Sequence, residues 1–322
     1  MLTLTLGSIV AIRVLVKIVR KTVLIPKLTI LDDLPMVGQT RNDGKIRGRA
    51  VICGGRCVAG LLAAAVCSEH FQSVLVIEAE GSVTELGVDK TEGKDLQTTP
   101  ALLRKRAEQH LTCHPFLPPV YLGLQRLFPH TLQQELAYFG FSVTPIAYRF
   151  TYGNNPSPDV FNPTDQNSPQ SLPISRQSFE TLLLRLVVKF CGNVKFITGT
   201  VDGYTRKDGG GRDISSVTVE GQNPETADFI VDATGPAQYS CHEWLRSAGF
   251  NPLPPSLAEY DPHLTYSQSV YTIPKEMLPE IEAVLPNGLL VGCVYINQPD
   301  NSTGESRALY IFLHENSQCK RS

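Results

Sequence analysis

The sequence has little of several features that mark particular classes of protein. Its 322 residues carry a formal net charge of only −2, so the charge balance gives no reason to expect a nucleic-acid partner. None of its eight cysteines forms a Cys-x-x-Cys pair, which argues against a zinc site and indicates reduced thiols in an intracellular compartment. There is no internal repeat and only one tryptophan, Trp244, which we expect in the core. Hydrophobic residues still make up 42%, enough for one large domain or two smaller ones.

Acidic side chains are absent from residues 1–31, although five basic ones occur there: Arg13, Lys17, Arg20, Lys21 and Lys27. At helical spacing the first four form one cationic stripe beside valine, isoleucine and leucine. Charges interrupt windows of about 18 residues across the centre, which makes this a poor membrane-spanning segment. Such a basic amphipathic extension has three interpretations: it lies on an anionic membrane, it acts as a mitochondrial presequence, or it packs against the body. The expected location is therefore cytoplasmic or mitochondrial, with peripheral membrane association as one option.

Residues 49–80 carry the strongest pattern in the chain. The apolar run Ala50–Cys53 predicts a short buried strand, and helical spacing begins at Cys57. A β-branched run, Val74–Ile77, predicts a second strand that ends at Glu78. Strand, glycine turn, helix, strand and acid are, in that order, the parts of a dinucleotide-binding unit.

Each part of this unit has a physical role. Gly54, Gly55 and Gly60 permit a tight turn and the close approach of a pyrophosphate, while Glu78 accepts hydrogen bonds from a ribose. Counted back from Gly60, the pattern G-x-G-x-x-G begins at Gly55 and places Cys57 at the middle glycine position, where a Cβ would crowd the phosphate. The alternative is an ordinary βαβ crossover whose glycines only turn the chain.

Residues 228–235, DFIVDATG, form the second informative run. A buried strand here ends in small residues and a glycine, which lets the backbone pass close to a bound ligand. Elsewhere, periodicity predicts helices at Ala101–His110, Val120–Phe139 and Arg176–Phe190, the last capped by Ser175, and strands at Phe141–Tyr152, Val194–Val201, Ser215–Val219, Leu264–Thr272, Leu289–Ile296 and Ala308–Leu313.

With both runs in place, the sequence resembles the FAD-dependent monooxygenases of the para-hydroxybenzoate hydroxylase type, especially members described as halogenase- or polyketide-hydroxylase-like. The resemblance covers about residues 32–316 and rests on AVICGG…AGLLAA, VLVIEAE, LGLQRLFPHTLQQEL, ISRQSFETLLLRLV and ADFIVDATGPAQYSCHEWLRSAGF. It implies an α/β fold in which a Rossmann-like FAD-binding domain is interleaved with a β-sheet substrate domain. It also implies that NAD(P)H reduces the flavin, which then reacts with O2 to oxygenate a small organic substrate.

We expect three parts: the basic extension at 1–31, which the charge pattern indicates, and two parts that the resemblance implies, an FAD-binding domain at 32–250 with a strand and loop insertion near 141–173 and a partial substrate-domain sheet at 251–322. It implies no metal and no identified catalytic residue. The cofactor-binding residues it implies are Gly54, Gly55, Gly60, Glu78, Arg106, Gln109, Val201, Asp232, Ala233, Thr234 and Gly235. For Arg106, which follows Arg104 and Lys105, a solvated helix charge is an equal interpretation.

One feature of that family is absent. Its members carry a later Gly-Asp motif that contacts the flavin, and this dipeptide occurs nowhere in the 322 residues. We therefore expect a chain that is incomplete at its C-terminus. Two alternatives stay open. The first is a catalytically inactive remnant that folds without cofactor, which Cys57 in the glycine motif favours. The second is a nicotinamide-dependent dehydrogenase, and the DATG strand argues against it.

Overall fold

The computed structural model describes residues 2–80, 116–146, 148–153, 155–156, 168–207, 213–235, 240–253, 292–296 and 308–312, with a few further positions between 267 and 280. The predicted helix Ala101–His110, including Arg106 and Gln109, lies outside the described residues. So does most of the predicted strand Leu264–Thr272.

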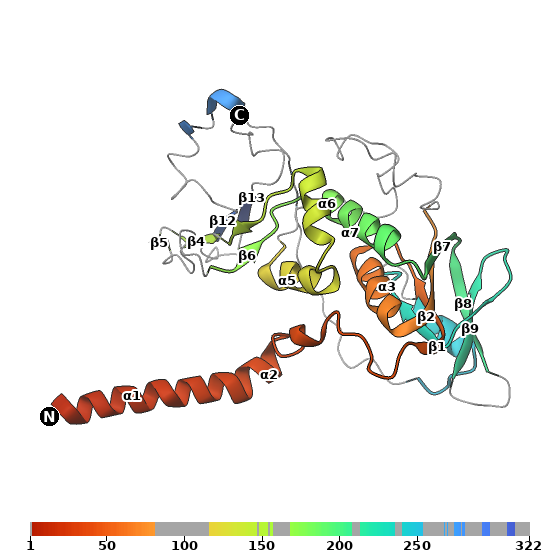
Figure 1. The fold of residues 1–322 in the computed structure, drawn as a ribbon, viewed down its shortest axis with the longest axis horizontal. Coiled ribbons are helices and arrows are strands. Elements are labelled where there is room, and N and C mark those ends of the chain that lie inside the picture. Colours follow the sequence, from red (N-terminus) through yellow and green to blue (C-terminus); the bar gives the residue numbers. More distant parts are fainter. Residues whose placement is uncertain are drawn as a thin grey trace, which may run out of the picture.

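The chain has a mixed α/β fold centred on a four-stranded parallel sheet of order β11-β1-β2-β7 (Figure 1). Its strands are β1 (Ile46–Cys53), β2 (Phe71–Glu78), β7 (Val194–Thr198) and β11 (Phe229–Asp232). Helix α3 (Val58–His70) crosses from β1 to β2. The strand–turn–helix–strand unit predicted from the sequence is thus confirmed, with both strands longer than the apolar runs that revealed them.

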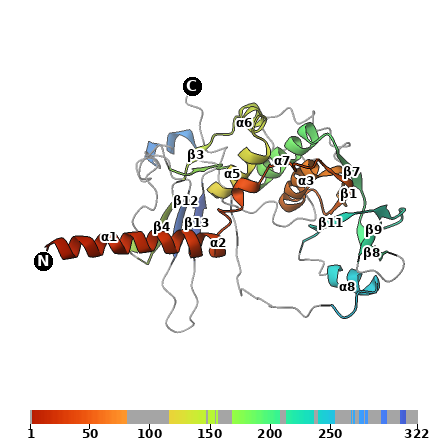
Figure 2. The ribbon, with the colours of Figure 1, turned by 60° about the horizontal axis from the view of Figure 1, so that its bottom comes forward.

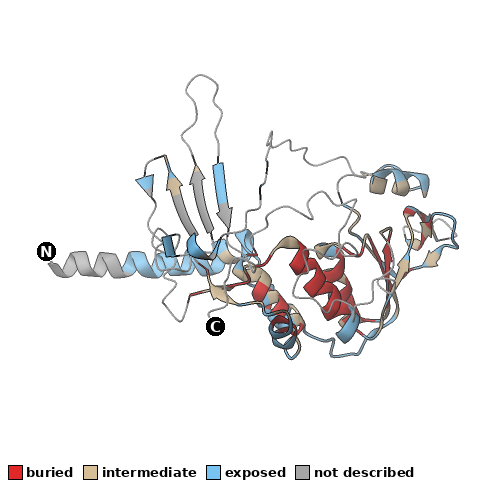
Figure 3. Cartoon of the chain, turned by 90° about the horizontal axis from the view of Figure 1, so that it is seen from above, coloured by how far each residue is buried: buried red, intermediate tan, exposed pale blue. Residues whose placement is uncertain are grey.

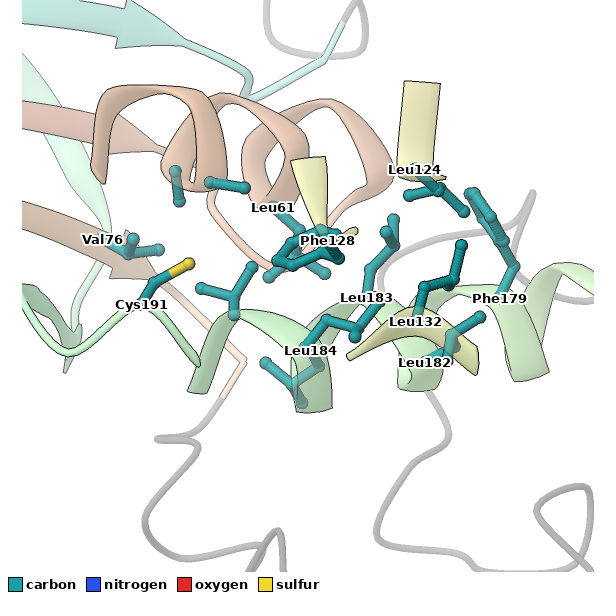
Figure 4. Close-up of a cluster of buried hydrophobic side chains, with 14 of the residues drawn as sticks. Leu61, Val76, Leu124, Phe128, Leu132, Phe179, Leu182, Leu183, Leu184 and Cys191 are labelled. Atoms are coloured by element: carbon teal, nitrogen blue, oxygen red, sulfur yellow. The ribbon is translucent and has the colours of Figure 1, made fainter. Parts of the chain in front are cut away.

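One face of this sheet is covered by helices, which are α3, α5 (Pro118–Leu127), α6 (Leu132–Phe139) and α7 (Arg176–Phe190). Side chains alternate across a strand, so Ala50 and Ile52 of β1 face these helices. Leu61 of α3 and Leu183 of α7 meet between them in the larger hydrophobic core (Figure 4). Ser175 caps α7 as predicted, because its Oγ accepts the Ser178 N–H at 3.1 Å.

The opposite face packs on a smaller antiparallel sheet and one helix, which are β8 (Val201–Arg206), β9 (Ile214–Val219), β10 (Glu225–Thr226) and α8 (Ser240–Ser247) (Figure 2). Val51 and Cys53 of β1 point to this side. Trp244 of α8 is only partly buried and packs edge-on against Tyr204, with ring centroids 5.5 Å apart. Because both faces are covered, the central strands are continuous apolar runs.

Two segments far apart in the sequence join in a second sheet of order β13-β12-β4-β5 (Figure 3). Its strands are β4 (Tyr148–Tyr152), β5 (Asn155–Pro156), β12 (Gly292–Ile296) and β13 (Ala308–Phe312). A small antiparallel pair, β3 (Thr144–Pro145) and β6 (Gln170–Ser171), lies near the two ends of the insertion. Strand β4 of the 141–173 insertion pairs in parallel with β12. That this sheet is a substrate domain stays a prediction.

The amino-terminal segment is helical and projects from the body (Figures 1 and 2). It consists of α1 (Leu2–Val19), a π-helical turn η1 (Arg20–Leu24) and α2 (Ile25–Leu28), followed by the short 3₁₀ turn η2 (Leu34–Met36). Leu34 is the first described residue to be buried. In the part of the chain that the structure describes, no helix is long and apolar enough to cross a membrane.

Three predicted elements differ in their boundaries. The predicted helix Val120–Phe139 is two helices, α5 and α6, separated at Pro129, which has no N–H to donate within a helix. The predicted strand Val194–Val201 is the end of one sheet and the start of another, since β7 stops at Thr198 and β8 begins at Val201. The predicted strand Phe141–Tyr152 begins only at Thr144 and continues as the separate strand β4.

Strand β11 was predicted to be buried, and this prediction was wrong. It is the edge strand of the parallel sheet, and Phe229 at its start remains 47% exposed. The sequence run is apolar enough for a buried strand, but a strand with one neighbour is covered less than a central one.

Candidate nucleotide site at the carboxyl ends of the sheet

The predicted nucleotide-binding residues of the two informative runs lie together at one edge of the parallel sheet. In the strand register, Cys53 of β1 stands beside Ile77 of β2 on one side and Asp232 of β11 on the other. The turn after β1, Glu78 at the end of β2 and the residues after β11 therefore meet at the carboxyl ends of three adjacent strands. Strand order reverses on either side of β1, which is where open α/β sheets bind ligands.

All three predicted glycines lie where a side chain would collide with neighbouring atoms. Gly54 has a φ of +73°, and a Cβ there would come within 2.7 Å of the Ala233 carbonyl oxygen. A Cβ on Gly60 would stand 2.7 Å from the carbonyl oxygen of Gly54, and one on Gly55 would overlap the Val76 side chain. These glycines are thus required for packing the turn against α3, β2 and the end of β11.

The glycines' own N–H groups do not face outward as donors. Those of Gly54 and Gly55 both donate to the Ile77 carbonyl oxygen, at 3.0 and 3.2 Å. The next N–H group, of Arg56, donates to Oε2 of Glu78 at 2.8 Å. The role of Gly54 and Gly55 toward a pyrophosphate therefore stays a prediction, limited to the close approach of their backbone.

The next backbone N–H groups in the chain, at the start of α3, differ from those of Gly54, Gly55 and Arg56. Cys57 is the N-cap of this helix: its Sγ accepts the Gly60 N–H at 3.2 Å, and its carbonyl accepts the Leu61 N–H at 2.9 Å. Within the described part of the chain, the N–H groups of Cys57, Val58 and Ala59 have no hydrogen-bond partner. Unpaired N–H groups at the positive end of a helix dipole attract anions.

The sequence did not reveal these three donors. Cys57 was interpreted only as a misfit at a glycine position, although it directly precedes the helical spacing and lies three residues before Gly60. That position relative to the helix is where a capping side chain is found. The thiol also lies 3.2 Å from the Gly54 carbonyl oxygen and 3.4 Å from that of Ala233, so it links the two turns.

Glu78 lies directly behind this helix start, at the end of β2. Its side chain is only 5% exposed, and its two oxygens accept the N–H groups of Arg56, at 2.8 Å, and Glu80, at 3.1 Å. Acceptance of a ribose hydroxyl by the same carboxylate stays a prediction. Glu78 therefore has a structural role in addition to the predicted one.

The turn after β11 is fixed by Asp232. Its Oδ1 accepts both the N–H and the hydroxyl of Thr234, at 3.0 and 2.6 Å, and its Oδ2 accepts the Tyr204 hydroxyl at 3.1 Å. Gly235 follows with a φ of +92°, a conformation that favours glycine. Ala233 donates its N–H to the Cys53 carbonyl oxygen at 2.8 Å, which ties this turn to β1.

The buried groups around Asp232 are held protonated. Burial, together with the Asp232 and Cys241 side chains, raises the pKa of the Cys53 thiol to about 12. Burial and the same carboxylate raise the pKa of Tyr204 as well. Neither group is therefore a nucleophile or a base near neutral pH. Among the described residues, no group of three His, Cys, Asp or Glu side chains is placed to hold a metal ion.

Val201 lies near this edge but presents its side chain to the smaller core. The Gly199 N–H donates to the Glu78 carbonyl oxygen at 2.9 Å, which brings the turn before β8 beside the end of β2. A contact between Val201 and adenine stays a prediction, and Arg106 and Gln109 lie outside the described residues.

No protein-family model and no curated protein matches the sequence. Solved structures that are similar in part include pqsL, a probable FAD-dependent monooxygenase from Pseudomonas aeruginosa, at 13% identity over 62% of this chain and 46% of that one, with a TM-score of 0.44. A tryptophan halogenase from Shewanella frigidimarina is similar at 11% identity over 66% of this chain and 46% of that one, with a TM-score of 0.41. The chain thus spans less than half the length of these two structures. At such identities and TM-scores, the likenesses assign neither a family nor an activity to the chain.

Proposed function

We propose that this site binds the ADP portion of FAD and that the chain is part of a flavin-dependent oxidoreductase acting on a small organic substrate. The observation that carries the proposal is the arrangement of three N–H groups, at Cys57, Val58 and Ala59, that have no partner among the described residues and lie beside the carboxylate of Glu78. An anion-binding helix start next to an acceptor for ribose hydroxyls suits a dinucleotide.

Each part of the site has a place in this proposal. The N–H groups at the start of α3 would hold the pyrophosphate, and Glu78 would accept from the adenosine ribose. The Ala233–Gly235 turn, held against Gly54, would form a second wall of the nucleotide site. FAD supplies the redox chemistry, with NAD(P)H as the proposed electron donor. The described residues contribute binding and orientation.

Addition of FAD to the purified full chain tests the proposal. We expect FAD to raise the melting temperature and NAD⁺ to have little effect, since a ligand that binds only the native state stabilises it by an amount that grows with the logarithm of the ligand concentration over its Kd. No response to FAD at high micromolar concentration would favour the inactive remnant, and a response to NAD⁺ alone would favour a dehydrogenase.

The variant Gly60→Ala provides a second test of the proposed FAD site. A Cβ there meets backbone at 2.7 Å, so it must shift the turn against α3, and we expect FAD affinity to fall. Gly123→Ala is the matched control, because a Cβ on Gly123 in α5 meets nothing within 4 Å. Unchanged FAD affinity in Gly60→Ala would contradict the assignment of this turn.

Glu78→Gln should weaken FAD binding about ten- to a hundredfold, because a hydrogen bond to a charged acceptor contributes about 1.5–3 kcal/mol. Titration of FAD by fluorescence measures the change. The thermal stability of the variant without FAD, measured in parallel, separates a lost ribose contact from a lost fold. Unchanged affinity would mean that Glu78 does not contact the ribose.

A further inference from the structure

The amino-terminal helix exposes apolar side chains that no described part of the body covers. Between residues 11 and 31, here called the basic segment, eleven large hydrophobic side chains are exposed. Ile12 is 61% exposed and Val14 is 50% exposed, and two residues apart on a helix they point to nearly opposite sides. A helix that is apolar on most of its circumference is normally buried in a core or in lipid. Figure 3 shows the basic segment mostly pale blue, in contrast to the red interior of the body.

The same segment is purely cationic. Its basic residues Arg13, Lys17, Arg20 and Lys21 follow one side of the helix, and no acid occurs before Asp32. None of the four has an ion-pair partner in the described part of the chain. The helix therefore offers both apolar surface and uncompensated positive charge, which are the two attractions that bind a helix in a membrane interface.

We propose that the basic segment binds the surface of an anionic lipid bilayer and thereby attaches the protein to a membrane. Its apolar side chains would lie at the boundary of headgroups and acyl chains, while the flexible lysine and arginine side chains reach the phosphates. A second copy of the chain is a poorer occupant, because pairing two such helices would bring like charges together with no acid to compensate them.

The connection to the body suits this attachment. The chain leaves the helix at Leu28 and enters the body at Leu34, which is buried beside α5. Gly38 lies directly against the backbone of Arg126 in the same helix. Binding of the basic segment to a bilayer therefore requires no described core residue to become exposed, and it is independent of the proposed nucleotide site.

Co-sedimentation of the full chain with vesicles tests the proposal. We expect at least tenfold stronger partitioning onto phosphatidylcholine vesicles containing roughly one third phosphatidylserine than onto pure phosphatidylcholine, and weaker partitioning in high salt, because exposed charges are screened. Replacing Arg13, Lys17, Arg20 and Lys21 by glutamine should lower partitioning at least tenfold, since each basic residue near an anionic surface contributes about fivefold.

A matched control removes four exposed charges from the body instead: Arg47, Lys195, Lys207 and Arg246, each replaced by glutamine. This variant should bind the vesicles like the unchanged protein. The double variant Leu15→Asp, Ile18→Asp keeps all the cations and should lose binding as well, because the apolar contact is removed.

Three outcomes would overturn the proposal. In the first, both four-charge variants bind the vesicles alike, which would show that the overall net charge of the protein, and not the basic segment, causes binding. In the second, the Leu15→Asp, Ile18→Asp variant binds as before, which would exclude insertion of apolar side chains. In the third, the unchanged protein binds neither kind of vesicle and elutes as an oligomer, whereas the Leu15→Asp, Ile18→Asp variant elutes as a monomer. That result would identify a second copy of the chain as the partner of the basic segment.

Discussion

Cys57 occupies the position where the nucleotide-binding pattern has its middle glycine, and its sulfur caps α3. It accepts the Gly60 N–H at 3.2 Å and lies within 3.4 Å of the Ala233 carbonyl oxygen, so it links the helix start to the turn after β11. Side chains that accept from the third helical N–H stabilise a helix by satisfying one of its unpaired donors.

Cys57→Ala should therefore lower the free energy of unfolding by about 0.5–2 kcal/mol, the usual contribution of an N-cap. Cys57→Ser keeps an acceptor at the same position and should be close to neutral. Urea unfolding of both variants measures the difference. Equal stability of the alanine and serine variants would show that the sulfur does not cap the helix.

Glu78→Ala should also destabilise the protein in the absence of any cofactor. The change leaves the N–H groups of Arg56 and Glu80 without the acceptor that the carboxylate provides, and a lost buried acceptor costs about 1–3 kcal/mol. Glu220→Ala, at an exposed position in the turn after β9, is the control and should change little. A fully stable Glu78→Ala variant would mean that water replaces the carboxylate.

At the scale of the elements, α6 and α7 are joined by a charge cluster in which Glu135 and Arg185 are buried and Lys189 lies at the surface. Glu135 of α6 accepts from the Arg185 Nε at 2.7 Å and from the Lys189 Nζ at 2.8 Å. The Arg185 guanidinium lies over the Tyr138 ring, 4.5 Å from its centroid. Burial alone would raise the pKa of Glu135, but the hydrogen bonds and charges of Arg185 and Lys189 outweigh it and hold the pKa below its ordinary value of 4.5.

Glu135→Gln should lower stability by about 3–5 kcal/mol near neutral pH, because it removes the carboxylate that two cations share. A lowered carboxylate pKa means that this contribution is present above pH 4.5 and is lost as the pH falls through the pKa of the folded state. The variant should therefore lose less stability than the unchanged protein on acidification.

Urea unfolding at neutral and at acidic pH measures both effects. The double variant Glu135→Leu, Arg185→Met should recover much of the lost stability, because apolar pairs often replace buried ion pairs without cost. If Glu135→Gln unfolds with the same acid dependence as the unchanged protein, the cluster does not contribute to the pH profile.

At the scale of the whole molecule, the body and the amino-terminal helix are energetically separate. No described residue between 11 and 33 is buried, and the core begins at Leu34. A helix without tertiary packing opens readily in water, whereas β1 and α3 open only with the core.

Limited trypsin treatment should therefore cut first after the basic residues of the helix, Arg13, Lys17, Arg20 and Lys21. The melting temperature of the remaining body should match that of the full chain. Mass spectrometry of early products identifies the sites, with Lys45 at the start of β1 as the internal comparison. Early cleavage after Lys45, or a lower melting temperature after loss of the helix, would show that the helix supports the body.

Much of the fold was predictable because its signals are local. Apolar runs flanking a glycine turn predicted β1, α3 and β2, and Ser175 marked the start of α7. The breaks at Pro129 and after Thr198 also carry local signals, a proline and Gly199, but the predictions carried the apolar periodicity across them.

The sequence by itself determined that Gly54, Gly60 and Glu78 occur at the spacing of a nucleotide-binding unit, and that the first acid follows five basic residues. Only the tertiary structure decided which N–H groups remain unpaired. The Ile77 carbonyl oxygen accepts those of Gly54 and Gly55, and Glu78 accepts that of Arg56; the first N–H group without a partner in the described part of the chain is that of Cys57. The physical reason is that a backbone donor is satisfied by whichever acceptor the fold brings within reach, and here those acceptors come from β2, more than twenty residues further along the chain.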